Sequence, residues 1–445
     1  MSASPSAASA EPGFTTRQVH AGADWAAASP RAVPLFLTAG FTFDDFDGAA
    51  GHFQEGTGFG YTRTGNPTID ALERKLAALE GGTDAVFVAS GQAAVAVALL
   101  GLLGAGDHVV ASTHIYEGSR GLLLDNLSRL GITVSFVEDI EDPDAWRAAS
   151  HTGTRAFFAE SIANARNDVL DIAAIAAVAQ ERGIPLVIDN TFATPYLLRP
   201  IEHGANVVVH SASKFLAGHG AALGGVIVDD GRFDAARSGP LFPHLVAATR
   251  AGGPSPAERH GGRARIAYVR ETVAPRFGPS PSPFNAFLVA QGIETLSLRV
   301  REQSRNALAV ARWLEGRPEV ESVDYAGLDS HPHHRIAERY LTRGYGAVFQ
   351  FTLHGGEAAA RGFVQAVEVF THMTHLGDVR SLVLHPGSTS HSQHTEDARR
   401  ALGVHPGTLR LSVGIEDIDD LLADLDHALR VSAHALAEST VEVLG

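Results

Sequence analysis

The chain has 445 residues, enough for two or three domains, and its 45% hydrophobic content is ordinary for a globular protein with a large core. Its 35 basic and 50 acidic residues give a net charge of −15, which argues against nucleic acid or an anionic membrane as the main partner. Because there is no cysteine, disulfides, thiolate metal sites and a cysteine nucleophile are excluded.

The amino-terminal sequence predicts a tail and then an arm. Residues 1–13 are rich in Ala, Ser and Pro and lack the basic and apolar regions of a signal peptide, which predicts a disordered tail. Residues 14–66 carry scattered aromatics with little periodicity, so we expect an arm that packs on something else and does not form a core of its own. No window has the apolar length of a membrane span, and we expect a cytoplasmic protein.

Residues 67–283 predict an α/β domain. A helix is expected from Pro67 to Leu79, with Gly81 and Gly82 as its stop. Seven short apolar runs then predict strands at 85–89, 108–111, 133–137, 156–159, 186–188, 207–210 and 226–228. Helical patterns separate most of them at 93–103, 119–130 and 172–182. This alternation predicts a mostly parallel sheet sandwiched by helices, with ligands at the carboxyl ends of its strands.

The remainder predicts a smaller second domain. Residues 238–283 are rich in Gly, Pro and Arg and predict a long irregular connection. One long helix is expected over 285–314, and shorter strands and helices follow, including 346–353 and 418–437. We therefore expect an α+β domain over 284–445.

Lysine is rare in this chain, and that draws attention to one residue. Lys75 and Lys214 are the only lysines. Lys75 lies in an amphipathic helix pattern and is interpreted as a solvated helix residue. Lys214 follows the strand 207–210 and comes directly after Ser211 and Ser213. Chemistry through a lysine amine would therefore use Lys214.

Other strand ends supply matching groups. The Ser90-Gly91-Gln92 turn opens a helix, where free N–H groups suit a phosphate, although alone it also fits a plain strand–helix turn. Asp189 ends a buried strand and calls for a cationic partner, although alone it fits a cap equally well. Together a phosphate cradle, an acid and a solitary lysine match the needs of pyridoxal phosphate (PLP).

Two competing motifs are rejected. The glycines at 218, 220 and 224 resemble a dinucleotide fingerprint only superficially, since they run into a strand. The histidines at 331–334 fit a polar loop, and His372 with His375 fits an ordinary helix face, better than a metal site.

Several segments together resemble the Cys/Met-metabolism family of fold-type I PLP enzymes, over about residue 14 to the C-terminus. The segments are 61–68 (YTRTGNPT), 160–164 (ESIAN), 189–195 (DNTFATP), 211–215 (SASKF), 385–388 (HPGS) and 408–414 (TLRLSVG). Within the family, the chain most resembles the O-acetylhomoserine sulfhydrylase branch. The markers of this branch are 218–220 (GHG), 223–225 (LGG) with the insert that follows, 284–287 (FNAF) and 410–416 (RLSVGIE).

The resemblance implies a role for each matching residue. Lys214 would form the Schiff base and shuttle protons, Asp189 would pair with the pyridine nitrogen, and Asn164 would contact the ring hydroxyl and the substrate. The cofactor phosphate would be held by Gly91, Gln92, Ser211 and Ser213, and by Tyr61 and Arg63 of a neighbouring subunit. Tyr116 would stack on the ring and assist elimination, and Arg410 with Ser388 would bind the substrate α-carboxylate. No metal is implied.

Four positions depart from the family pattern. Ala165 stands where a proline is usual, Glu117 and Gly387 where a glycine and an alanine are usual, and the arm segment 37–41 is less polar. Glu117 adds charge near the expected entrance, which leaves nucleophile preference open. Gly118 stands where the methionine-cleaving lyases of the family carry a cysteine.

The resemblance implies γ-replacement on O-acetyl-L-homoserine with sulfide or a small thiol, giving homocysteine or methionine plus acetate in sulfur amino-acid metabolism. A homo-oligomer is expected, with a catalytic dimer that pairs into a tetramer. A PLP-dependent γ-lyase is the alternative within the family. A catalytically silent PLP-binding interaction protein is the alternative of another class.

Overall fold

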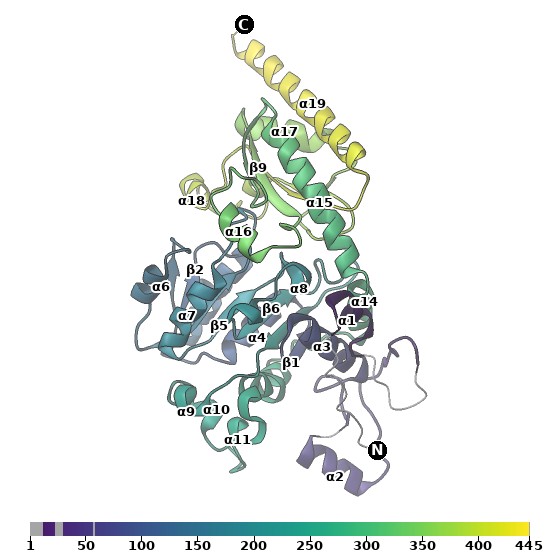
Figure 1. Ribbon diagram of the computed structural model, residues 1–445, viewed down its shortest axis with the longest axis vertical. Coiled ribbons are helices and arrows are strands. Elements are labelled where there is room, and N and C mark those ends of the chain that lie inside the picture. Colours follow the sequence, from purple (N-terminus) through teal and green to yellow (C-terminus); the bar gives the residue numbers. More distant parts are fainter. Residues whose placement is uncertain (1–11, 23–29, 57, 445) are drawn as a thin grey trace, which may run out of the picture.

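The computed structural model describes residues 12–22, 30–56 and 58–444, with the side chains of Glu55 and of 434–444 left out (Figure 1). Most of the predicted tail, residues 1–11, lies outside the described residues. Within the described part no helix is both long and apolar enough to cross a membrane.

The arm is more ordered than its sequence predicts. It contains helix α1 (Phe14–His20) and helix α2 (Phe46–Glu55), which the sequence pattern did not predict. Helix α2 begins where Asp45 accepts a hydrogen bond from the Gly48 N–H, a local signal that aromatic periodicity does not reveal. The predicted helix 67–79 is confirmed as α3 (Pro67–Glu80), which Asn66 caps and Gly81 ends in the left-handed region.

The large sheet has the predicted strands and direction. Its order is β1-β7-β6-β5-β4-β2-β3, and only β7 runs antiparallel to its neighbours. The strands are β1 (Asp84–Val88), β2 (His108–Ser112), β3 (Thr133–Val137), β4 (Thr154–Glu160), β5 (Leu186–Asp189), β6 (Val207–Ser211) and β7 (Gly225–Asp229). The predicted mostly parallel α/β sheet is therefore confirmed.

Both faces of this sheet are buried. In β1, Ala85 and Phe87 belong to one hydrophobic core, while Val86 and Val88 belong to the other. The covering helices include α3 and α7 (Ile172–Arg182) on one face and α4 (Gly91–Leu100) and α12 (Ala264–Tyr268) on the other. Because successive side chains of a strand point to opposite faces, this division explains the continuous apolar runs.

The connection from β6 to β7, which carries Lys214 and is described throughout, contains no helix, whereas the other remaining connections of the large sheet do. Their helices are α5 (Glu117–Gly121), continued by a π-helical turn at 122–127 and a 3-10 turn at 128–130, then α6 (Pro143–Ala149) and α8 (Thr194–Leu197). The predicted helix over 119–130 is thus present, but only its start is α-helical.

The segment 238–283 is not irregular, and that prediction was wrong. After α9 (Ala235–Ser238), it folds into short helices, which besides α12 are α10 (Pro243–Val246), α11 (Pro256–His260) and α13 (Ala274–Phe277). Proline stands in the first turn of three of them, and Ser255 with Glu258 forms a capping box at α11. The prolines that suggested a loop therefore begin helices.

The second sheet has five strands in the order β10-β11-β12-β9-β8. They are β8 (Val320–Asp324), β9 (Val348–Leu353), β10 (Thr371–His372), β11 (Leu382–Leu384) and β12 (Thr408–Ser412). Its helices are α15 (Leu296–Glu315), α16 (His334–Tyr340), α17 (Gly356–Ala366), α18 (Glu396–Ala401) and α19 (Ile418–Leu444). The single helix expected over 285–314 is two helices, α14 (Pro283–Ile293) and α15, separated at Glu294 and Thr295.

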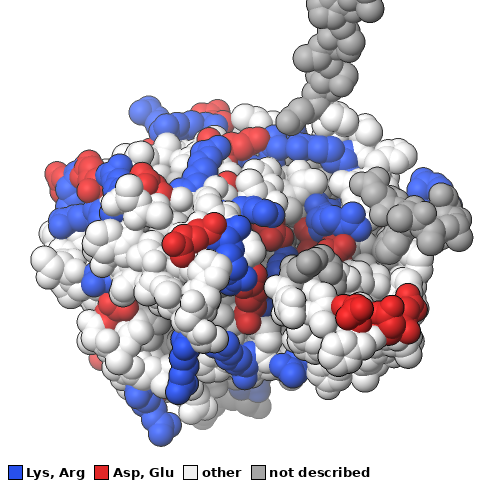
Figure 2. Space-filling model, turned by 90° about the horizontal axis from the view of Figure 1, so that it is seen from below, with Lys and Arg blue, Asp and Glu red and all other residues white. Residues whose placement is uncertain are grey.

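Lys75 is buried, so its interpretation as a solvated residue was wrong. It is 3% exposed on α3, and its Nζ donates to the Gln18 carbonyl oxygen of α1 at 2.9 Å. The arm covers the face that the amphipathic pattern assigned to solvent. Since Lys214 also lies inside the protein, the basic groups on the described surface in Figure 2 are arginines, interspersed with acidic groups.

Candidate active site

A cavity of about 250 Å³ lies at the carboxyl ends of the central strands. It brings together nine of the predicted site residues: Gly91, Gln92, Tyr116, Asn164, Asp189, Ser211, Ser213, Lys214 and Arg410. Arg410 comes from β12 of the second sheet, while most of the others follow strands of the large sheet. The cavity is therefore where the two sheets contribute to one site, as expected for an α/β fold of this kind.

The start of helix α4 forms an anion cradle. Ser90 caps the helix by accepting from the Ala93 N–H at 3.1 Å, so the N–H groups of Gly91 and Gln92 fall in the first turn, where a helix offers them no acceptor. A Cβ on Gly91 would lie 2.5 Å from the Cβ of Ser211, which explains the glycine. Free N–H groups and the positive end of the helix dipole favour a phosphate here.

The two serines contribute unequally to this cradle. The Ser213 hydroxyl is held by the Gly224 backbone, accepting from its N–H at 3.0 Å. Ser211 is anchored through its N–H, which donates to Thr191 Oγ1 at 2.8 Å, and its side chain faces Gly91. Ser211 is therefore the hydroxyl better placed to bind a ligand.

Asp189 presents a buried carboxylate to the cavity. Burial raises its pKa, and two hydrogen bonds from Thr191, both to Oδ1, oppose the rise. A cationic group beside Asp189 would restore the charged carboxylate. A protonated pyridine nitrogen has this property.

Glu160 is a second buried acid that the sequence did not single out for a role. It pairs in register with Asp189 across β4 and β5, and burial together with the Asp189 charge raises its pKa to about 8. Its oxygens accept from the N–H groups of Tyr116 at 2.5 Å and Asn164 at 3.0 Å. Glu160 thus fixes the backbone of two predicted site residues. The signal was its place at a strand end, next to the acid that was noticed.

Lys214 and Arg410 are the two cations of the site. Burial and the nearby Arg410 charge lower the pKa of Lys214 to about 8. Arg410 is 8% exposed, and burial lowers its pKa to about 10. Its guanidinium donates only to neutral oxygens, namely the carbonyls of Thr374 and His375 and Asn164 Oδ1, at 3.2 to 3.4 Å. No ion pair among the described residues includes Arg410, so it is suited to receive an anion.

Tyr116 stands at the rim of the cavity. Its side chain is about half exposed, and its ring packs so closely against Gly118 that a Cβ there would collide with it. Gln92 Nε2 donates to the Gly118 carbonyl at 2.9 Å and ties this turn to the anion cradle. Gly118, noted in the sequence as the position of a cysteine in lyases, therefore leaves room for the tyrosine ring.

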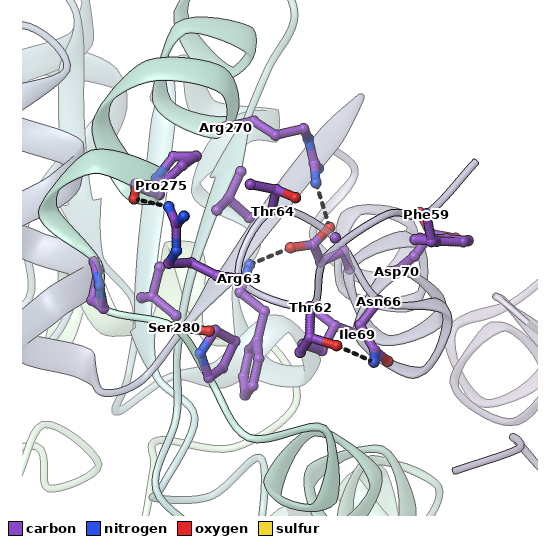
Figure 3. Close-up of a pocket in the computed structure, with 18 of the residues that line it drawn as sticks. Phe59, Thr62, Arg63, Thr64, Asn66, Ile69, Asp70, Arg270, Pro275 and Ser280 are labelled. Atoms are coloured by element: carbon purple, nitrogen blue, oxygen red, sulfur yellow. Dashed lines mark hydrogen bonds and ion pairs between the residues drawn. The ribbon is translucent and has the colours of Figure 1, made fainter. Parts of the chain in front are cut away.

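Three predicted site residues do not line this cavity. The Ser388 hydroxyl bonds with His385 Nδ1 at 2.9 Å. Arg63 donates to the Pro275 carbonyl at 2.6 Å and lies over the Tyr61 ring, 5.3 Å from its centroid. Figure 3 shows Arg63 pointing to Pro275 in a separate cavity of about 420 Å³. Within one chain, the structure keeps Tyr61 and Arg63 away from Lys214.

His375 was misplaced by the sequence analysis. It lies in the loop after β10, not on a helix, and it lines the cavity with its Nδ1 3.2 Å from Lys214 Nζ. His372, which was paired with it, is exposed in β10. Nothing in the local sequence pattern indicates that a loop of the second sheet reaches the lysine of the first.

The residues present fit PLP. A buried amine, a buried carboxylate that needs a cation and a helix start that needs an anion surround one cavity, beside a buried guanidinium with no acid partner. When bound, PLP supplies an aldehyde that joins an amine and a ring that withdraws electrons from Cα of an amino acid.

Comparisons with known proteins give the same cofactor. The family model described as "Cys/Met metabolism PLP-dependent enzyme" matches residues 15–430. O-acetyl-L-homoserine sulfhydrylase of Corynebacterium glutamicum is 44% identical, covering 93% of this chain and 96% of that protein. Homocysteine synthase of Schizosaccharomyces pombe is 41% identical, covering 94% of this chain and 98% of that protein.

A solved structure agrees in both fold and chemistry. The crystal structure of a putative O-acetylhomoserine (thiol)-lyase from Campylobacter jejuni has a TM-score of 0.88 and 33% identity, covering 94% of this chain and 99% of that one. It contains a pyridoxyl-lysine monophosphate, in which the cofactor is attached to a lysine. The matched family, the shared fold and the cavity agree: this chain belongs to the Cys/Met metabolism family of PLP-dependent enzymes.

Proposed function

We propose that this enzyme catalyses γ-replacement on O-acetyl-L-homoserine, in which sulfide or a small thiol displaces acetate from Cγ and gives homocysteine or methionine. The relatives that are 40 to 44% identical over at least nine-tenths of the chain and are named as sulfhydrylases or homocysteine synthases support it. The observation that carries it for this chain is the buried Arg410, which has no acid partner in the described part of the chain and lies in the same cavity as Lys214. An amino-acid carboxylate supplies the anion that Arg410 lacks.

Each group in the cavity has one task in this proposal. Lys214 holds the cofactor until the substrate amine takes its place, and its freed amine then removes the Cα proton. Asp189 holds the cofactor nitrogen in its protonated form, and Asn164 contacts the ring hydroxyl. The start of α4 with Ser211 and Ser213 holds the phosphate.

The substrate side of the cavity is defined by Arg410 and Tyr116. Arg410 binds the α-carboxylate and thereby directs the side chain of the substrate toward the rim. Tyr116 stacks on the cofactor ring and helps acetate to leave. The Ser388 hydroxyl bonds with His385 in this structure. Ser388 therefore assists Arg410 only if the loop at 385–388 closes on the substrate.

Sulfide decides between replacement and lysis. We expect O-acetylhomoserine with sulfide to give homocysteine and acetate, and omission of sulfide to give only slow release of 2-oxobutanoate. Homocysteine and 2-oxobutanoate can both be followed in one coupled assay. Keto-acid formation that sulfide does not reduce would favour the γ-lyase. A yellow protein without turnover on any γ-substituted homoserine would favour the silent PLP-binding protein.

We also propose that the arm serves a second copy of the chain. Its exposed apolar side chains include Phe46 and Phe53 of α2, at 86% and 81%, and Tyr61 is half exposed. A second copy that covers this surface would receive Tyr61 and Arg63 near the phosphate of its own cofactor. Three further statements remain predictions from the sequence. They are the pairing of such dimers into a tetramer, the cytoplasmic location, and the division of the chain at residues 14–66, 67–283 and 284–445.

A further inference from the structure

His375 contacts both cations of the active site. Its Nδ1 lies 3.2 Å from Lys214 Nζ, and its backbone carbonyl accepts from Arg410 Nη2 at 3.2 Å. The loop that carries it is held at its far end, where the Gly377 N–H donates to Ser412 Oγ at 2.9 Å and the Asp378 carbonyl accepts from Gln303 at 2.7 Å. A single anchored loop therefore contacts the lysine with a side chain and the arginine with its backbone.

The charges around His375 keep its imidazole neutral. The groups that act on it are Lys214, Arg410 and Arg380, which are cationic, and Asp378, which opposes them. Burial and these cations lower the pKa of His375 to about 4, whereas that of Lys214 is about 8. Because the pKa of His375 lies well below that of Lys214, the shared proton resides on Lys214. His375 is therefore a hydrogen-bond acceptor for the amine and not the base that receives its proton.

The same geometry selects one tautomer. If Nδ1 accepts from Lys214, the ring proton resides on Nε2. That atom is buried and has no hydrogen-bond partner among the described residues. The ring therefore leaves the buried Nε2 without a hydrogen bond while Nδ1 faces the lysine. An apolar side chain that only filled the space would not have this cost.

We propose that His375 is a positioning residue for the reacting lysine: its Nδ1 accepts a hydrogen bond from the Lys214 amine and aims the amine at the Cα proton of a substrate whose carboxylate Arg410 holds. The loop 373–378 then sets both ends of this geometry, the amine and the carboxylate. The inference rests on the proposed role of Lys214 as the cofactor lysine, and the experiment tests that role separately.

The experiment uses the full-length holoenzyme and three variants. His375→Leu removes the acceptor at similar bulk, His375→Asn retains an acceptor oxygen, and His372→Leu changes an exposed histidine of the same segment. Exchange of the Cα proton of L-norvaline in D2O, followed by NMR across pH, reports the lysine step without the leaving group or sulfide. Reduction of the holoenzyme with borohydride and peptide mass analysis identifies the lysine that carries PLP.

Exchange in His375→Leu should fall about 30-fold at its plateau, since a misaimed amine loses catalysis steeply. Its midpoint should move about one pH unit lower, because the ammonium loses a charge-assisted hydrogen bond. We expect the exchange rate of His375→Asn to stay within about threefold of the wild-type rate, and that of His372→Leu to equal the wild-type rate. The KM for O-acetylhomoserine in His375→Leu should change less than about threefold.

Three results would overturn the inference. One is an unchanged plateau and midpoint in His375→Leu. Another is equal loss in the Leu and Asn variants, and a third is release of PLP by His375→Leu, since both indicate a packing role. Cofactor found on Lys75 would instead overturn the assignment of Lys214, on which the proposed function depends.

Discussion

At the scale of single residues, the site is defined by charges that are buried without their usual partners. Among the described residues, neither Arg410 nor Asp189 forms an ion pair, although burying a charge without a partner costs free energy. Buried Arg265 has Asp229 beside it, whereas buried Arg299 donates to backbone carbonyls. Arg410 differs from Arg299 because it lines the candidate active-site cavity. The unmet charges in the cavity are therefore best explained by ligands that supply the missing partners.

Replacing Arg410 should weaken substrate binding selectively. In Arg410→Gln we expect the KM for O-acetylhomoserine to rise about 10- to 100-fold, since a charged hydrogen bond is lost, while the KM for sulfide stays unchanged. The KM of Arg410→Lys for O-acetylhomoserine should lie between those of wild type and Arg410→Gln, because an ammonium keeps the charge without the planar fork. Arg305→Gln, at an exposed arginine paired with Glu302, is the control for loss of a guanidinium. Equal effects on both substrates would contradict a carboxylate-binding role.

His108 should make the fold sensitive to acid. It is 2% exposed in β2, bonds with the hydroxyls of Thr154 and Ser135, and burial lowers its pKa to about 4. The unfolded histidine takes up a proton near pH 6.5, so this stabilisation is complete above pH 6.5 and is lost as the pH falls through 4. Between these values, wild type should lose about 3 kcal/mol of unfolding free energy relative to His108→Gln in urea titrations. Parallel pH curves for the two proteins would contradict this.

At the scale of elements, the sequence predicted what is local. The ends of β5 and β6 were found because a short apolar run followed by Asp189 or by Lys214 is visible within ten residues. The pairing of Glu160 with Asp189 depends on register between two strands, and the contact of His375 with Lys214 joins residues 161 positions apart. Neither leaves a pattern in one segment. The prediction for Lys75 was wrong for a related reason, since the pattern of an amphipathic helix does not reveal that another element covers its polar face.

The first residue of α5, Glu117, links the two sheets near the rim of the cavity. Glu117 Oε1 lies 3.0 Å from His394 Nε2, in the loop before α18, and Oε2 lies 3.9 Å from Arg120 Nε. Because the pair is only partly buried, its contribution to stability should be below about 1 kcal/mol. Because Glu117 directly follows Tyr116 at the rim, its carboxylate should instead make the entrance of the cavity more negative.

Removing the Glu117 charge should favour an anionic nucleophile. In Glu117→Gln we expect the KM for hydrosulfide to fall about two- to fivefold at low ionic strength, with the difference shrinking as salt is added. The KM for O-acetylhomoserine, which has no net charge as a zwitterion, should barely change. Glu357→Gln, an exposed acid on α17 paired with Arg361, controls for the overall charge. A salt-independent change would contradict an electrostatic origin.

At the scale of the whole molecule, the arm lies apart from the cavity that contains Lys214. The predicted phosphate ligands Tyr61 and Arg63 lie in the arm, where Arg63 bonds with the Pro275 carbonyl beside a separate cavity (Figure 3). The arm also carries exposed aromatic rings on α2, which extends away from the rest of the chain in Figure 1. Both observations have one explanation if the arm completes the site of a second copy.

Hybrid dimers can decide where Arg63 acts. Arg63→Ala and Lys214→Ala should each be nearly inactive alone, but a hybrid dimer of the two should regain about half of the wild-type activity per dimer, since one of its two sites combines Lys214 of one chain with Arg63 of the other. A hybrid of Lys214→Ala with Arg410→Gln is the matched control, because these residues share one cavity and no complete site can form. Activity is measured on hybrids purified through two different affinity tags. Inactive Arg63→Ala/Lys214→Ala hybrids would show that Arg63 serves its own chain, and the arm would then have only a structural role between subunits.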